Sequence, residues 1–192
     1  MAYPIGQTFY VNEPAGGAPG VFITAIDIYF KSVSATQGMT LEIRQTQNGV
    51  PTQSKLAFGI KTLLPSDSPA TTTDSNGIVY SINPIATDDA SISTRFIFDT
   101  PVFVESGKSY AMVLIPVGGS PNYTIWTATI GGTDVLTNNP IYTNNNTGDL
   151  FLSSNDIDWQ PVITEDWKFN ILTANFTSTT GTAYFHSPNE DY

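Results

Sequence analysis

The segment "RFIFDTPVFVESGKSYAMVLIP" (residues 95–116) decides the fold class, because it contains two β-strand patterns joined by a short turn. The second pattern, "SYAMVLIP" (109–116), is apolar at almost every position. Since alternate side chains of a strand point to opposite faces, Met112 and Val113 point in opposite directions and both need apolar surroundings. We therefore predict that 109–116 is a central strand covered on both faces.

The segment "GVFITAIDIYFK" (20–31) has the same kind of pattern. Its apolar residues recur at period two, and many of them are β-branched or aromatic, which favours a strand. Regular alternation places Phe22, Ile26 and Ile28 on one face of this strand and Ile23 on the other.

The segment "TLEIRQ" (40–45) alternates apolar and charged residues. This pattern predicts a half-buried strand in which Leu41 and Ile43 point to the core. On the same pattern, Glu42 and Arg44 point to water.

Two further segments show where strands are interrupted. "KLAFGIKTL" (55–63) reads as a strand with an interruption at Gly59, and "LPSDSPATTTDSNG" (64–77) reads as a long polar loop. Glycine, proline and small polar residues favour such breaks. We expect the loop to be a mobile insertion.

Short strands at fairly regular spacing, separated by turn residues, are typical of an all-β sandwich or barrel. We predict about eight to ten strands in a two-sheet antiparallel sandwich of jelly-roll type, with negligible helix. One domain over residues 1–176 fits this pattern best.

The remaining residues, 177–192, begin as a polar Thr/Gly linker and include Tyr184 and Phe185. We predict a partly ordered C-terminal extension. Its two aromatic residues are candidates for an interface with a neighbouring molecule, because aromatic side chains are enriched at protein interfaces.

Composition limits the classes of function. The 192 residues include 17 acidic and 7 basic ones, for a net charge of −10, which argues against binding to phosphate backbones. The chain has no cysteine, so disulfides and thiolate chemistry are excluded. The start "MAYPIGQTFYVNEP" shows no signal-peptide pattern, and no apolar run is long enough to span a bilayer, so we expect no membrane insertion.

Catalytic patterns are scarce, and we predict that the protein is not an enzyme. The single histidine, His186, lies in the tail, where few neighbours would orient a catalytic imidazole. Glycoside hydrolysis needs two carboxylates across a cleft. The chain offers adjacent or alternate acids, which we interpret as solubilising charges at loops and strand edges: Asp88 with Asp89, Asp156 with Asp158, and Glu165 with Asp166.

One loop could hold a metal ion. "SSNDIDW" (153–159) provides Asn155, Asp156 and Asp158 within one turn, and oxygen ligands of this kind suit calcium. The loop lacks the spacing of an EF-hand and its final glutamate. Calcium is therefore the one cofactor candidate, and the alternative is that no cofactor binds.

Four aromatic residues are candidates for glycan binding: Trp159, Tyr142, Trp126 and Tyr123. Exposed aromatic rings stack on the apolar faces of sugars, and nearby amides supply hydrogen bonds. Trp126 lies in an alternating strand pattern that favours core packing, whereas Trp159 and Tyr142 lie in loops, where exposure is easier. Aromatic residues also suit core packing or a protein interface, so the pattern leaves both interpretations open.

Several stretches resemble a β-sandwich domain of tailed-phage structural proteins, especially baseplate and tail proteins. They are "GQTFYV", "PGVFITAIDIYFKS", "LEIRQTQNGVPTQ", "RFIFDTPVFVESGKSYAMVLIP", "YTIWTATIGGTD" and "GDLFLSSNDIDWQPVITEDWKFNIL". Their order and spacing extend from about residue 5 to residue 176. In the phage proteins this domain usually lies inside a longer chain, whereas here it nearly fills the sequence.

The resemblance implies a jelly-roll sandwich and a non-enzymatic structural role in the virion, as a baseplate or tail component. It also implies contacts with other virion proteins or with copies of the chain, and contact with host-surface glycans. A carbohydrate-binding module and a head-decoration subunit remain alternatives. We expect a protein made in the host cytoplasm and located in the phage particle.

Overall fold

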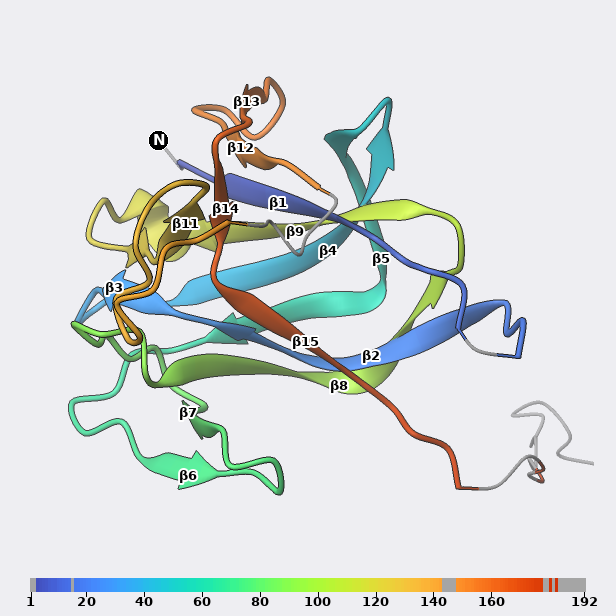
Figure 1. Ribbon diagram of the computed structural model, residues 1–192, viewed down its shortest axis with the longest axis horizontal. Coiled ribbons are helices and arrows are strands. Elements are labelled where there is room, and N and C mark those ends of the chain that lie inside the picture. The colour runs from blue at the N-terminus through green and yellow to red at the C-terminus, as the bar shows by residue number, and fades with distance from the viewer. Residues whose placement is uncertain (1–2, 15, 143–147, 178–179, 181, 183–192) are drawn as a thin grey trace, which may run out of the picture.

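The structure is a computed structural model, and it describes residues 3–14, 16–142, 148–177, 180 and 182. Two β-sheets lie face to face as two layers (Figure 1), so the predicted all-β sandwich is confirmed. In the described ranges, the helical content is a single 3-10 turn at Val117–Gly119. Jelly-roll connectivity stays a prediction.

The first layer, sheet A, has six strands in the order β13-β12-β1-β9-β4-β5. Their bounds, in that order, are Gln160–Val162, Leu150–Leu152, Ile5–Tyr10, Ser109–Pro116, Met39–Gln47 and Val50–Leu63. The second layer, sheet B, has five strands in the order β15-β2-β8-β7-β6. Their bounds, in that order, are Phe169–Thr173, Gly20–Ile28, Ser93–Glu105, Val79–Ser81 and Thr71–Thr73.

Two short strand pairs complete the described fold. Antiparallel pairs join β3 (Phe30–Ser32) to β10 (Thr124–Ile125) and β11 (Thr127–Thr129) to β14 (Glu165–Trp167). Within the larger sheets the pairing is antiparallel, except that β7 runs parallel to β8. The strands outnumber the expected eight to ten, because three-residue strands are too short to reveal an alternating pattern.

The central strand predicted at 109–116 is confirmed as β9. It pairs with β1 on one side and with β4 on the other, and Met112 and Val113 are both fully buried. Met112 points into the core between the sheets. Val113 lies on the outer face of sheet A, opposite Gly6 of β1, and the Trp159 ring lies over Gly6.

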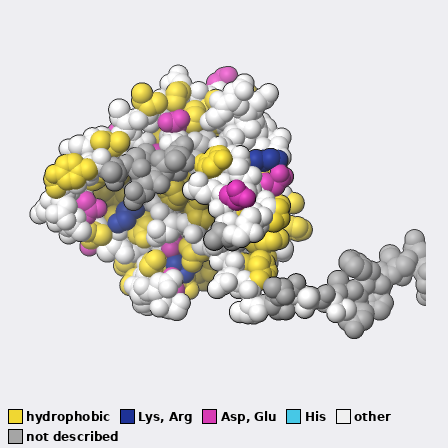
Figure 2. Space-filling model, turned by 45° about the vertical axis from the view of Figure 1, so that its right-hand side comes forward, with side chains coloured by type: hydrophobic (Ala, Val, Ile, Leu, Met, Phe, Trp, Pro, Cys, Tyr) yellow, Lys and Arg dark blue, Asp and Glu magenta, His cyan; other side chains and the backbone are white. Residues whose placement is uncertain are grey.

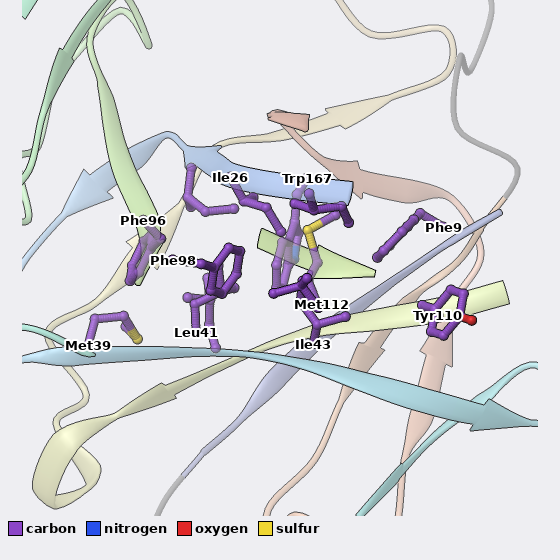
Figure 3. Close-up of a cluster of buried hydrophobic side chains, with 14 of the residues drawn as sticks. Phe9, Ile26, Met39, Leu41, Ile43, Phe96, Phe98, Tyr110, Met112 and Trp167 are labelled. Carbon is purple, nitrogen blue, oxygen red and sulfur yellow. The ribbon is translucent and has the colours of Figure 1, made fainter. Parts of the chain in front are cut away.

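Apolar side chains from both sheets form one core cluster. Figure 3 shows these side chains pointing toward one another from facing strands, among them Phe9, Ile26, Met39, Leu41, Ile43, Phe96, Phe98, Tyr110, Met112 and Trp167. Each large apolar side chain that is fully buried stabilises the fold by about 1.5–3 kcal/mol. The core therefore fixes how the two sheets face each other.

The predicted orientation of two neighbouring side chains of β2, Phe22 and Ile23, is wrong. Ile23 is buried in the core, and Phe22 lies on the outer face of sheet B beside Phe103. The cause is a bulge, because the register between β2 and β8 shifts between Ile23 and Ala25. A bulge reverses the facing of the residues that precede it, and simple alternation does not reveal this.

The expected exposure of Glu42 and Arg44 is also wrong. Both side chains lie on the outer face of sheet A, as alternation requires, yet both are buried. A loop that follows β12 covers this face and supplies Asp156 as a partner for Arg44. The position of that loop is a tertiary feature that β4 alone does not encode.

Candidate functional site

A buried arginine holds the outer layer of sheet A in place. The Arg44 side chain is 1% exposed, and its Nη1 and Nη2 donate to the two carboxylate oxygens of Asp156 at 2.8 and 3.0 Å. Its Nε donates to Glu42 Oε2 at 2.8 Å, and Lys55 Nζ donates to Glu42 Oε1 at 2.7 Å. Burial disfavours the charge of Arg44, but the hydrogen bonds to Asp156 and Glu42 outweigh it and raise the pKa of the guanidinium.

A second buried arginine, Arg95, holds a loop against the outer face of sheet B. Arg95 Nε and Nη2 donate to the two carboxylate oxygens of Asp27 at 2.6 and 2.7 Å, and Nη2 also donates to Asp74 Oδ2 at 2.8 Å. The Tyr80 ring lies 3.8 Å from the guanidinium carbon. Asp74 belongs to the predicted loop 64–77, so this contact ties the end of that loop to the sheet.

Arg44 and Arg95 are the two arginines of the chain. Each binds two carboxylates, and each bridges the outer face of a sheet to a loop. We call these two groups the Arg44 clamp (Arg44, Glu42, Asp156 and Lys55) and the Arg95 clamp (Arg95, Asp27 and Asp74). Both clamps are made of paired charges with no open reactive position, so their geometry indicates a structural role.

The predicted calcium residues lie in the loop over sheet A. Asn155 Nδ2 donates to Asp158 Oδ2 at 2.7 Å, whereas Asp156 turns both carboxylate oxygens toward Arg44. A guanidinium and a calcium ion would compete for those same oxygens. Calcium binding here stays a prediction.

Two of the four predicted glycan-binding aromatics make internal contacts. Trp159 covers sheet A, since a Cβ added at Gly6 would lie 3.3 Å from the indole ring. Tyr123 contacts Phe30 edge-on, with ring centroids 5.5 Å apart, and its hydroxyl donates to the Gln37 carbonyl at 2.5 Å. Trp159 and Tyr123 therefore lie in separate surroundings and do not form one surface on which a sugar could stack.

The other two aromatics lie near a pocket of about 500 Å³ at the β15 edge of the sandwich. Trp126 lines this pocket, and its Nε1 donates to the Thr87 carbonyl at 2.8 Å. Tyr142 is 80% exposed and directly follows Ile141, which also lines the pocket. Tyr184 and Phe185, the predicted interface residues, lie outside the residues that the structure describes.

The wall of this edge pocket is mainly apolar. It is built by the end of β1, the β11–β14 pair, the 130–141 segment and β15, and its apolar lining includes Phe9, Trp126, Ile130, Val135, Phe169 and Ile171. A concave apolar site of this size with a few polar groups is the usual form of a binding site.

Three charged groups line the edge pocket: Asp134, Asp166 and Lys168. Burial lowers the pKa of Lys168, and nearby Asp134 and Asp89 oppose that shift. The Lys168 Nζ donates to the Ala90 carbonyl at 2.9 Å, so this ammonium group is already held by the fold. Hydrogen bonds from Thr137 lower the pKa of Asp134, which keeps a negative charge at the pocket.

The outer face of sheet B carries exposed aromatic residues. Phe22 packs against Phe103 and Phe176, with ring centroids 5.0 and 5.3 Å apart. Phe176 is 65% exposed, and Ile97 of β8 is also exposed. In Figure 2, apolar side chains gather in patches on the face shown, and basic side chains are few. We call Phe22, Phe103 and Phe176 the sheet B patch.

Sequence reasoning missed the two clamps and the edge pocket. The one available signal for the clamps was Asp27, a lone acid within the apolar segment 20–31, because a buried acid needs a partner. No local signal marks the pocket, because its wall comes from segments that are far apart in the sequence.

No family model, curated protein or solved structure matches this chain. Among the described residues, no group of three or more His, Cys, Asp or Glu side chains is arranged to hold a metal ion. A helix long and apolar enough to cross a membrane is likewise absent from the described residues.

Proposed function

We propose that this chain is a non-enzymatic structural subunit of a tailed-phage particle, as a baseplate or tail component that makes protein–protein contacts. The observation that carries this proposal is the sheet B patch, where Phe103 and Phe176 keep large parts of their rings in water. Exposed aromatic clusters of this kind mark interaction surfaces in proteins.

The rest of the chain supports a contact-making role. The sandwich uses both of its arginines to fix loops, and few charged residues remain, since these make up 12% of the sequence. The resemblance of residues 5–176 to phage β-sandwich domains points in the same direction. A head-decoration subunit would use the same kinds of surface.

Glycan recognition is the alternative that a test must separate from this role. Trp126 and two carboxylates, Asp134 and Asp166, line the edge pocket, and an aromatic ring with hydrogen-bond acceptors suits a sugar. A glycan array probed with the wild-type chain and with Trp126→Ala tests this alternative. Specific binding that Trp126→Ala abolishes would favour it.

The structural role is tested by the protein content of the particles. Phage particles from cells that carry the gene are purified on a density gradient, and mass spectrometry quantifies this chain in the particle fraction. We expect a fixed number of copies per particle, comparable with known structural proteins of the same particle. A chain found only in the unassembled fraction would contradict the proposal.

A further inference from the structure

Phe58 of β5 has an unusual conformation for a bulky residue. Its φ is +63°, in the left-handed region that favours glycine, and its side chain is 67% exposed. A bulky non-glycine residue in this region is strained, at a cost in free energy, and persists only where its surroundings enforce it. An exposed ring adds nothing to the core that would offset this cost.

The surroundings of Phe58 form a fixed bulge. Lys55 pairs with Arg44 and Ile60 pairs with Glu42, so four residues of β5 lie opposite one residue of β4. Within the bulge, Leu56 packs on the core, and a Cβ added at Gly59 would lie 3.2 Å from the Cβ of Ile43. The bulge is thus anchored on both sides of Phe58 and presents its ring outward.

The edge pocket lies across the molecule from this bulge. β5 is the edge strand of sheet A, and β4 and β9 separate it from β1, which contributes Phe9 to the pocket. Figure 1 shows β5 bending at the right of the view, whereas β11 lies at the left. An apolar projection and an apolar pocket on opposite sides are the two halves of a head-to-tail contact.

The charges around each of the two features are nearly balanced. Lys55 and Lys61 stand three residues before and three residues after Phe58, and they are two of the five lysines in a chain of net charge −10. Within one copy, Lys55 is paired with Glu42 and Lys61 with Asp99, so the surface around Phe58 is nearly neutral. Asp134 and Asp166 line the pocket together with Lys168, which offsets part of their negative charge. Contact between these two surfaces therefore brings little like charge together, whereas most other pairings of two such acidic molecules bring like charges together.

We propose that the edge pocket of one copy binds Phe58 of a second copy. This inference rests on the proposed structural role, because it names the contact by which the subunits join. The contact uses two different surfaces, so each molecule has one Phe58 and one pocket to offer. Repetition of the contact builds a ring if the rotation closes, and an open chain otherwise.

Two single-residue variants and their mixture test this contact by size-exclusion chromatography with light scattering. Phe58→Ser removes the ring, and Ile130→Lys places a charge at the exposed rim of the pocket. We expect wild type to form oligomers, and each variant alone to be a monomer. The mixture should give a species of twice the monomer mass, because one variant keeps the pocket and the other keeps the ring.

A second pocket variant and a control complete the test. Ala128→Trp fills the pocket from β11, so a folding failure of Ile130→Lys does not decide the result. Ile82→Ser removes an exposed apolar side chain just after β7, outside both proposed surfaces and outside the sheet B patch, and should leave the oligomer mass unchanged. Circular dichroism shows that each variant is folded.

The opposite results would overturn the contact. A monomeric wild type at all concentrations, or a mixture of variants that stays monomeric, contradicts the inference. A specific oligosaccharide that fills the pocket while wild-type oligomers persist also contradicts it. A wild-type monomer that is nevertheless present in purified particles would refute this contact and leave the proposed virion role standing.

Discussion

Arg44 lies on the outer face of sheet A with its guanidinium between Glu42 and Asp156. A buried charge is costly unless it is paired, and a buried pair contributes little net stability compared with apolar residues of the same size. Breaking the pair is different, because it leaves an uncompensated charge. The main effect of the two arginine clamps is therefore to fix the position of each loop. Their net contribution to the free energy of unfolding is small.

Replacing Arg44 tests this interpretation. Arg44→Met leaves the buried carboxylate of Glu42 without its main partner, and we expect a loss of about 3–5 kcal/mol in the free energy of unfolding. Urea denaturation measures it. Lys108→Met, which removes an exposed partner of Glu105, is the matched control and should cost less than about 1 kcal/mol. Equal effects of the two substitutions would contradict the role of the clamp.

Asp74 gives the Arg95 clamp a pH dependence. The hydrogen bond from Arg95 lowers the pKa of this carboxyl, and backbone hydrogen bonds from Ile78 and Asn76 act in the same direction. Because the pKa of Asp74 is lower in the folded state, its ionised carboxylate stabilises the fold. This stabilisation is complete above the pKa of the unfolded chain, about 3.9, and is lost as pH falls through the pKa of the folded state.

The comparison with Asp74→Asn isolates that stabilisation. We expect the variant to be less stable than wild type at neutral pH, and the difference to shrink between about pH 5 and about pH 2. Urea midpoints across this range provide the measurement. A difference that stays constant or widens on acidification would rule out the assigned sign.

At the scale of elements, β9 was predictable and its neighbours were less so. The run from Tyr110 to Ile115 requires burial on both faces, whatever the rest of the chain does. Alternation failed at Phe22 because a bulge shifts the register of β2. It also failed for the exposure of Arg44, because the covering loop comes from more than a hundred residues further along the chain.

The candidate site was less predictable than the fold. Trp126 was identified from sequence as a candidate binding residue, and the structure places it in the edge pocket. Trp159, which lies in a predicted loop, was the better candidate for exposure, yet it packs on Gly6. The local pattern favoured a core position for Trp126 and exposure for Trp159, and it failed because only the tertiary fold decides which ring faces a pocket and which covers a strand.

Val113 tests the central position of β9. Val113→Asp would place a second buried carboxylate directly opposite the buried Glu42, where like charges repel and burial disfavours the charge. We expect this variant to yield no soluble folded protein. Val117→Asp, at an exposed position just after β9, is the control and should fold normally. A well-folded Val113→Asp protein would show that the outer face of β9 is open to water.

At the scale of the whole molecule, the surfaces of contact are apolar while the overall charge is strongly negative. Phe58, Phe176 and the edge pocket lie on a body of net charge −10, whose copies repel one another except where charges are paired. Lys61 and Lys108 are both paired with acids of β8, which lowers the repulsion at that face. Contact between copies is therefore favoured at a few surfaces only.

Electron microscopy of purified phage particles, labelled with gold-conjugated antibody against this chain, tests the virion role most directly. Gold at one fixed structure of the particle, at the tail or baseplate, is the predicted result, and particles that lack the gene should carry none. Particles without label, in preparations where the antibody binds free protein in the lysate, would contradict the proposed function.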